Sequence, residues 1–249
     1  MPRYRVTLEY DGTPYCGYQR QNNGPSVQGA LEAAVLRCTR EKVTIGAAGR
    51  TDTGVHALAQ VAQIDLEKVW DEGKLFRAIN AMLKQADEPI AVLDLAQAPD
   101  DWDARFSATA RHYRYRILTR EAAPTIDAKR VWWVRRGLDA EAMADAAHEL
   151  IGHHDFTTFR STDCQAKSPE KTLGTLNVER RDDEIHVTAS ARSFLHNQVR
   201  SLVGTLKMVG AGRWTRADVA AALAARDRRA CGPVAPACGL YFVKVDYPD

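Results

Sequence analysis

A single carboxylate, Asp52, stands in the loop with the densest group of chemically capable side chains. This loop, residues 49–57 (GRTDTGVHA), has a guanidinium at Arg50, two residues before the carboxylate, and an imidazole at His56, four residues after it. Its two glycines permit backbone conformations that other residues avoid. An ionised carboxylate can act as a nucleophile or stabilise a cation, whereas an aspartate in a glycine-rich turn often only hydrogen-bonds its own backbone.

A second group lies in residues 111–118, which alternate as a half-buried strand does. Tyr113 and Tyr115 share one face, whereas Arg114 and Arg116 lie on the other. Tyrosines opposite cations suit a surface that stacks a base and meets phosphates. The same alternation is typical of half-buried tyrosines beside solvent-exposed arginines.

A third candidate is Arg200, in a segment with helical periodicity. The apolar stripe of this segment has five members: Leu195, Val199, Leu202, Leu206 and Val209. Arg200 lies off the stripe, so its side chain can point toward a ligand or toward solvent. The adjacent His153 and His154 point apart in any strand or helix, so we expect no metal there. No dinucleotide fingerprint or P-loop is present, and we expect no cofactor.

Strand and helix patterns alternate along the chain and surround these groups. In the first part we expect strands at 3–10, 43–47, 60–66 and 90–95, with helices beginning at Ser26 and spanning 71–83. In the second part we expect strands at 111–118, 173–179, 185–191 and 240–247, and helices at 139–151 and 194–209. A further short helix begins with a capping box of Thr215 and Asp218.

This order predicts an α+β fold with two ferredoxin-like, RRM-like βαββαβ halves. The proline and acidic residues near position 100 divide the halves into 1–103, which carries the Asp52 loop, and 104–249. We expect the halves to form a mixed, mainly antiparallel sheet with helices on one side and a central cleft. Such clefts are preferred places for ligand sites.

The composition is that of a globular chain of 249 residues, 45% of them hydrophobic, with a net charge of +2. Arginines recur in groups, around positions 111–116, 135–136 and 226–229, which makes contact with phosphates plausible. The five cysteines form no C-x-x-C pair, which favours free thiols in a reducing compartment. With neither an apolar signal region nor a long apolar run, we expect a cytoplasmic protein with no membrane partner.

Four segments, in order, resemble motifs of the TruA-type tRNA pseudouridine synthases. They are GRTDTGVHA at 49–57, ARHYRY at 110–115, SFLHNQVRSLVG at 193–204 and GPVAPACGL at 232–240. The resemblance covers nearly the whole chain and implies the pseudouridine synthase fold.

The resemblance also implies an activity and a set of roles. Asp52 would be the catalytic residue, Tyr113 would stack on the target base and Arg200 would pair with the carboxylate; Arg50 is our candidate for a second cation or a phosphate contact. The family isomerises uridines 38, 39 and 40 in the tRNA anticodon stem-loop, as a homodimer. Isomerisation requires neither metal nor cofactor.

Two alternatives follow from the residues without the family. A non-catalytic RNA-binding protein of two ferredoxin-like units would use Asp52 only to pin its loop. A hydrolase would use His56 or His153 with an aspartate, with or without a metal. Neither explains four motif-like segments in one order, so the synthase is the favoured interpretation.

Overall fold

The computed structural model describes residues 1–22 and 24–248, which form two compact units. Unit 1 comprises the chain up to Arg111 and the C-terminal segment that starts at Tyr241, and unit 2 comprises His112–Leu240. These units differ from the predicted halves, 1–103 and 104–249, because the last strand joins unit 1 through its pairing with an N-terminal strand. Asp52 belongs to unit 1, whereas Tyr113 and Arg200 belong to unit 2.

Unit 1 has the predicted order strand, helix, strand, strand, helix, strand. Its elements are β1 (Arg3–Tyr10), α1 (Val27–Thr39), β2 (Gly46–Ala47), β3 (His56–Asp65), α2 (Glu72–Gln85) and β4 (Ile90–Ala98), followed at the end of the chain by β10 (Leu240–Asp246). β1 lies between β4 and β3 and is antiparallel to both. β10 pairs in parallel with the start of β3, and β2 pairs with the C-terminal part of β3.

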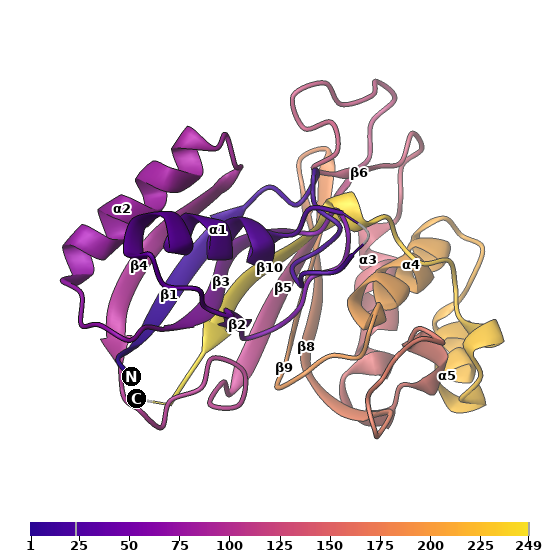
Figure 1. Cartoon of the computed structure of the whole chain (residues 1–249). Helices are drawn as coiled ribbons and strands as arrows, with labels where there is room; N and C mark the ends of the chain where they lie inside the picture. The colour runs from indigo at the N-terminus through magenta and orange to yellow at the C-terminus, as the bar shows by residue number, and fades with distance from the viewer. Residues whose placement is uncertain (23, 249) are drawn as a thin grey trace. The chain divides into compact units, whose positions relative to one another are not determined.

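The apolar alternation of β1 and two helix caps account for this arrangement. The even-numbered residues of β1, from Tyr4 to Tyr10, are at most 4% exposed, so one face of the strand is core. Ser26 caps α1 by accepting a hydrogen bond from the backbone of Gly29 at 3.2 Å, and Asp71 caps α2 in the same way. α1 packs beside α2, and α2 packs on β4 (Figure 1).

Unit 2 contains the remaining strands and α-helices. They are β5 (Ala110–Leu118), β6 (Trp132–Trp133), α3 (Ala140–Ala147), β7 (Gly152–Asp155), β8 (Glu170–Arg181), β9 (Glu184–Ala191), α4 (Gln198–Gly210) and α5 (Arg216–Ala225). The strand order is β5-β9-β8-β7, and β6 pairs in parallel with β5. α3 packs on β8, α4 and α5, and the three helices gather on one side of β8 and β9 (Figure 1).

The α+β class with a mainly antiparallel sheet arrangement is confirmed, with three local corrections. The strand expected at 43–47 is limited to Gly46–Ala47. β3 starts at His56 rather than at residue 60, so the last two residues of the 49–57 loop are in a strand. The helix expected from residue 194 begins at Gln198, because Asn197 has a left-handed backbone with φ of 62° that a helix cannot continue through.

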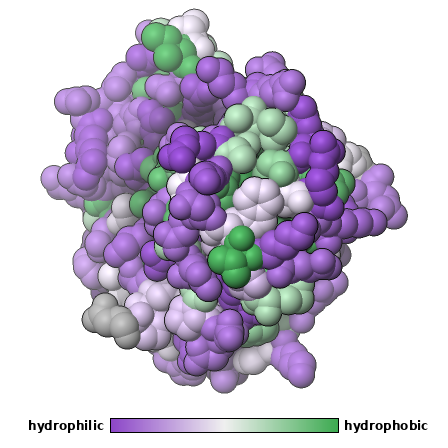
Figure 2. Space-filling model, turned by 60° about the vertical axis from the view of Figure 1, so that its left-hand side comes forward, coloured by the Kyte–Doolittle hydropathy of each residue, from purple (hydrophilic) through white to green (hydrophobic). Residues whose placement is uncertain are grey.

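Hydrophilic side chains cover most of the face drawn in Figure 2, where hydrophobic ones appear singly or in small groups. Such scattered apolar residues are usual on a globular surface. Within residues 1–22 and 24–248, none of the helices is long and apolar enough to cross a membrane.

Candidate active-site loop and its partners

The loop that carries Asp52 is fastened first at Ala48 and Gly49. The carbonyl oxygen of Ala48 accepts hydrogen bonds from Nε of Arg111 at 3.2 Å and from its Nη2 at 2.9 Å. The carbonyl of Gly49 accepts a bond from Nε2 of Gln60 at 2.8 Å. Arg111 is only 8% exposed, so it is a structural residue of unit 1. The sequence grouped it with the arginines expected on the surface, and for this residue that expectation is wrong.

Thr51, directly before Asp52, is held by both its backbone and its side chain. Its carbonyl accepts a hydrogen bond from the backbone N–H of Tyr18 at 3.0 Å, and its hydroxyl lies 2.9 Å from the Tyr10 hydroxyl. Gly17 lies so close that an added Cβ would be 2.7 Å from the Thr51 carbonyl oxygen, and its φ of +96° also favours glycine. Segment 10–18 therefore forms a close-fitting support for this residue.

Asp52 itself begins a tight turn. Its carbonyl accepts a hydrogen bond from the N–H of Val55 at 3.1 Å, and Gly54 takes the positive φ, 75°, that the third position of such a turn requires. The Asp52 side chain is half-buried, whereas Arg50 and Thr53 are exposed. The turn thus presents the Asp52 carboxylate between exposed Arg50 and Thr53. The loop that carries the turn is held in place at its base.

His56 has a structural place beneath this turn. It is 3% exposed, and its Nδ1 lies 3.1 Å from both the backbone N–H of Gly12 and a carboxylate oxygen of Asp11. Its ring stacks on Tyr241 with centroids 4.9 Å apart. A Cβ on Gly12 would meet the Val55 carbonyl oxygen at 2.0 Å, which shows how closely these backbones approach. An imidazole enclosed in this way is poorly placed to meet a substrate.

The two tyrosines of β5 have different surroundings. Tyr115 is fully buried and donates a hydrogen bond from its hydroxyl to the Pro236 carbonyl at 2.6 Å; burial raises the pKa of this hydroxyl well above its usual range. Tyr113 is half-buried, and its ring meets the half-buried ring of Phe194 edge-on, with centroids 5.1 Å apart. Of the two tyrosine rings, only that of Tyr113 is partly exposed and so open to a stacking partner.

Arg200 is oriented by its own helix and by the segment before β10. Its Nε donates a hydrogen bond to the Ala235 carbonyl and its Nη1 donates one to Oδ1 of Asn197, both at 2.8 Å. The backbone N–H of Ala235 in turn bonds to the Arg200 carbonyl at 3.0 Å. Segment 232–236 lies directly on α4, because a Cβ on Gly204 would be 1.7 Å from the Pro233 carbonyl oxygen.

The histidines that suggest a metal site make other contacts. His153 Nδ1 lies 3.1 Å from the Thr172 hydroxyl, and His154 Nε2 lies 2.9 Å from the Ile151 carbonyl oxygen. In the described part of the chain, no three His, Cys, Asp or Glu side chains are grouped to hold a metal ion.

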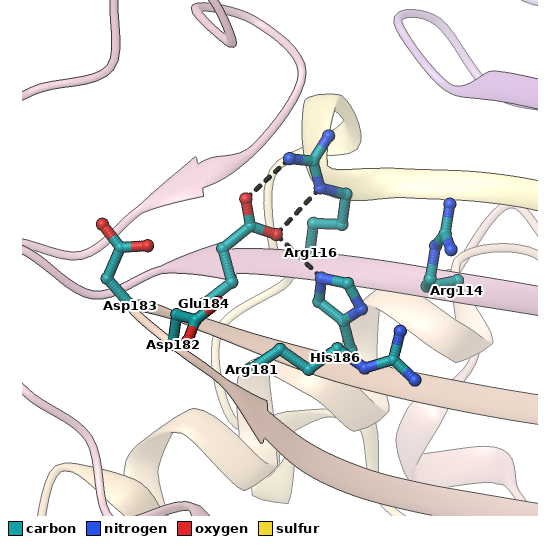
Figure 3. A pocket seen from close by; sticks show the side chains of 7 residues that line it. All are labelled: Arg114, Arg116, Arg181, Asp182, Asp183, Glu184 and His186. Carbon is teal, nitrogen blue, oxygen red and sulfur yellow. Dashed lines mark hydrogen bonds and ion pairs between the residues drawn. The ribbon is translucent and has the colours of Figure 1, made fainter.

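A separate polar hollow of about 350 Å³ lies in unit 2 (Figure 3). Seven residues line it: Arg114, Arg116, Arg181, Asp182, Asp183, Glu184 and His186. Glu184 accepts hydrogen bonds from Arg116 at 2.6 and 2.9 Å and lies 2.8 Å from Nε2 of His186. Because Glu184 pairs with Arg116 and His186 inside the hollow, and two further charges of the lining pair with residues outside it, the hollow is better explained as a structural network than as a ligand site.

Four of the residues that hold the site had no role in the sequence interpretation. Tyr10 and Gln60 fasten the Asp52 loop, whereas Asn197 and Ala235 orient Arg200. The signals were present in part: a glutamine in an apolar strand, and the GP-x-AP part of the fourth motif-like segment, for which no contact was predicted. The predicted pairing of Asp52 with Arg200 stays a prediction, as do the roles of Tyr113 and Arg50.

A loop-borne carboxylate in an α+β fold of this kind is consistent with the family that the four segments resemble. A family model described as tRNA pseudouridine synthase matches residues 7–107 and 146–248, which include Asp52 and Arg200 but not Tyr113. The chain therefore belongs to the tRNA pseudouridine synthase family, which is a family of isomerases, and the expected resemblance is confirmed.

Curated relatives extend over the whole chain. A protein named tRNA pseudouridine synthase A from Rhizobium meliloti (strain 1021) is 59% identical and covers 99% of this chain and 100% of its own. Proteins of the same name from Agrobacterium fabrum and Brucella ovis are 61% and 60% identical, covering 100% and 99% of this chain and 94% and 98% of their own. Among solved structures, a chain of a Cbf5-Nop10-Gar1 complex matches at 12% identity with a TM-score of 0.35, covering 82% of this chain and 45% of its own, which is too weak to support an argument.

Proposed function

We propose that this protein converts uridine to pseudouridine at positions 38, 39 and 40 of the tRNA anticodon stem-loop, with Asp52 as its catalytic residue. The observation that carries the proposal is the Asp52 turn, whose base is held by buried hydrogen bonds at Ala48 and Thr51 and by a part-buried one at Gly49. Preorganisation of this kind is typical of a reacting group and is more than a solvent-exposed turn needs.

The reaction breaks the N1–C1′ bond of uridine, rotates the uracil and forms a C5–C1′ bond. The hydrogen on C5 leaves to solvent and N1 gains one, so the product is an isomer and no oxidant or reductant is consumed. One ionised carboxylate suffices, either as a nucleophile or as a stabiliser of the cationic sugar. Asp52 is assigned this role.

The remaining predicted residues support that carboxylate or the base. We assign Arg200 as the counter-charge to the Asp52 carboxylate, because opposite charges attract more strongly in a site that excludes water. A uridine in a stem must first leave the stack, at a cost of a few kcal/mol that stacking helps to offset. Tyr113 is assigned to this stacking, and exposed Arg50 to a phosphate contact.

The partners in this proposal are tRNA and a second copy of the chain. Relatives at about 60% identity carry tRNA in their names, which supports tRNA as the substrate. The homodimer follows from the family resemblance, and the cytoplasmic location is supported by the five cysteines without a C-x-x-C pair, which favour a reducing compartment. Sedimentation of the protein with and without tRNA measures the first of these.

A positional assay tests the proposal. A tRNA transcript with uridines at 38, 39 and 40 is incubated with the protein, and pseudouridine is mapped by carbodiimide treatment and primer extension. The native protein and Asp94→Asn, which changes an exposed carboxylate on β4, should give stops at those positions. Asp52→Asn should give none while still binding the tRNA. Modification by Asp52→Asn, or modification only outside the anticodon stem-loop, would contradict the proposal.

A further inference from the structure

We propose that Tyr10 is a positioning residue that fixes the Asp52 carboxylate through Thr51. This inference rests on the proposed function and adds a residue to its site. Tyr10 lies outside the 49–57 loop and ends β1, and its side chain reaches the residue directly before the reacting carboxylate.

The contact is a buried hydrogen bond between two hydroxyls. The Tyr10 oxygen lies 2.9 Å from Oγ1 of Thr51, and the two residues are 4% and 6% exposed. Burial raises the pKa of Tyr10 to about 12, although hydrogen bonds with Thr51 and Gln60 act in the opposite direction. The Tyr10 hydroxyl therefore keeps its proton at every pH at which the enzyme would work.

The sheet is irregular beside this contact. The pairing of β1 with β3 shifts by one residue between Leu8 and Tyr10, so Leu8 faces Gln60 but Tyr10 faces Ala57. Irregularities of this kind are frequent next to active sites. The extra residue lies on β3, between Ala57 and Gln60, so Tyr10 stays on the buried face of β1 and its hydroxyl reaches Thr51 from there.

Fixing Thr51 at two points fixes the start of the Asp52 turn. The Tyr18 N–H holds the Thr51 carbonyl at 3.0 Å and Tyr10 holds its side chain, so rotation about the Thr51 backbone breaks at least one bond. Both bonds are shielded from water, which cannot replace them readily. Because small displacements of a reacting group reduce rates strongly, loss of the Tyr10 hydroxyl should lower turnover more than binding.

Tyr4 provides a matched control on the same strand and the same face. It is fully buried, and its hydroxyl bonds to the backbone of Trp70, accepting from the N–H at 2.7 Å and donating to the carbonyl at 3.1 Å. Tyr4→Phe therefore removes two part-buried bonds of a tyrosine hydroxyl, between β1 and a loop that carries no predicted site residue.

The experiment measures single-turnover tritium release from C5-labelled tRNA over a range of enzyme concentrations, together with thermal unfolding. Tyr10→Phe should lower the maximal rate about tenfold, the loss expected when one positioning bond is removed. The enzyme concentration that gives half the maximal rate (half-saturation) should not change. Tyr4→Phe should lower the unfolding temperature by a similar amount but leave the rate as in the native protein. Thr51→Val should reproduce the Tyr10→Phe defect, and Thr51→Ser, which keeps the hydroxyl, should restore most of the rate.

Three results would overturn the inference: equal rate losses in Tyr10→Phe and Tyr4→Phe, a change confined to half-saturation, or a Thr51→Ser variant as slow as Thr51→Val. If Tyr10→Phe does not fold, the two Thr51 variants decide alone. Failure of the proposed function is recognised separately, because the native protein would then release no tritium or Asp52→Asn would release it normally.

Discussion

Gly204→Ala is a one-methyl change in α4 that should release Arg200 from a distance. Alanine is favoured over glycine in a helix interior by about 1 kcal/mol, so propensity alone predicts stabilisation. The new Cβ, however, would lie 1.7 Å from the Pro233 carbonyl oxygen and 3.1 Å from the Ala235 nitrogen, whereas real Cβ contacts essentially never fall below 3.0 Å. Both partners are backbone atoms, so segment 233–235 must move off the helix.

The packing cost should exceed the propensity gain. Overpacking of this kind costs about 1–3 kcal/mol. Moving Ala235 also breaks its hydrogen bond with the Arg200 guanidinium, and a bond to a charged group contributes about 1.5–3 kcal/mol. After subtraction of the helix term, we expect a net loss of about 1.5–5 kcal/mol, which corresponds to a fall in Tm of roughly 3–20 °C for a chain of this size.

Thermal unfolding followed by circular dichroism, and tritium release under single turnover, measure the two effects of Gly204→Ala. Gly137→Ala in the same unit is the control, because its Cβ would meet no atom within 4 Å. The expected result is a lower Tm and a rate at least tenfold lower for Gly204→Ala, with little change for Gly137→Ala. A Tm equal to or above that of the native protein would refute the packing argument, and a native rate despite a lower Tm would refute the link to Arg200.

Three further predictions concern stability and binding. The hydrogen bond from Arg116 lowers the pKa of Glu184, so this carboxylate stabilises the fold above its unfolded pKa, about 4.3, and the contribution is lost as pH falls through the lower folded value. Urea unfolding should show Glu184→Gln less stable than the native protein at pH 7, with a difference that shrinks as pH falls below the unfolded pKa; a difference that does not change with pH would contradict this. Thr215→Ala removes the capping box with Asp218 and should cost about 1 kcal/mol in the same measurement, whereas no loss would show that the cap is unimportant. Binding of tRNA should weaken linearly in log–log titrations with salt, with a slope set by the phosphates contacted, and a flat line would argue against backbone contacts.

The local pattern predicted most elements of the fold because each depends on neighbours within a few residues. Alternation in β1 and the caps at Ser26 and Thr215 are examples. The predicted start of α4, at residue 194, was wrong. Periodicity extends the helix back to this residue, but Asn197 has a left-handed backbone conformation, which the spacing of apolar residues does not reveal. A sequence pattern shows which side chains share a face of an element, but it does not show where the backbone departs from regular dihedral angles.

The supports of the site depend on contacts between residues far apart in the chain. Tyr10 and Thr51 are separated by 41 positions, and Arg200 and Ala235 by 35. Arg111 was grouped with neighbouring arginines as a surface cation, yet it bonds to the backbone of unit 1. Charge and spacing do not reveal such burial, because it is the tertiary packing that places carbonyl oxygens around the guanidinium.

The most direct test of the central claim is tritium release from tRNA labelled at C5 of uridine, measured for the native protein and for Asp52→Asn under single turnover. Formation of the C5–C1′ bond displaces this hydrogen, so the label reports the reaction itself. We expect release by the native protein and none by Asp52→Asn, with both proteins folded and binding tRNA equally. Release by Asp52→Asn at the native rate would contradict this expectation.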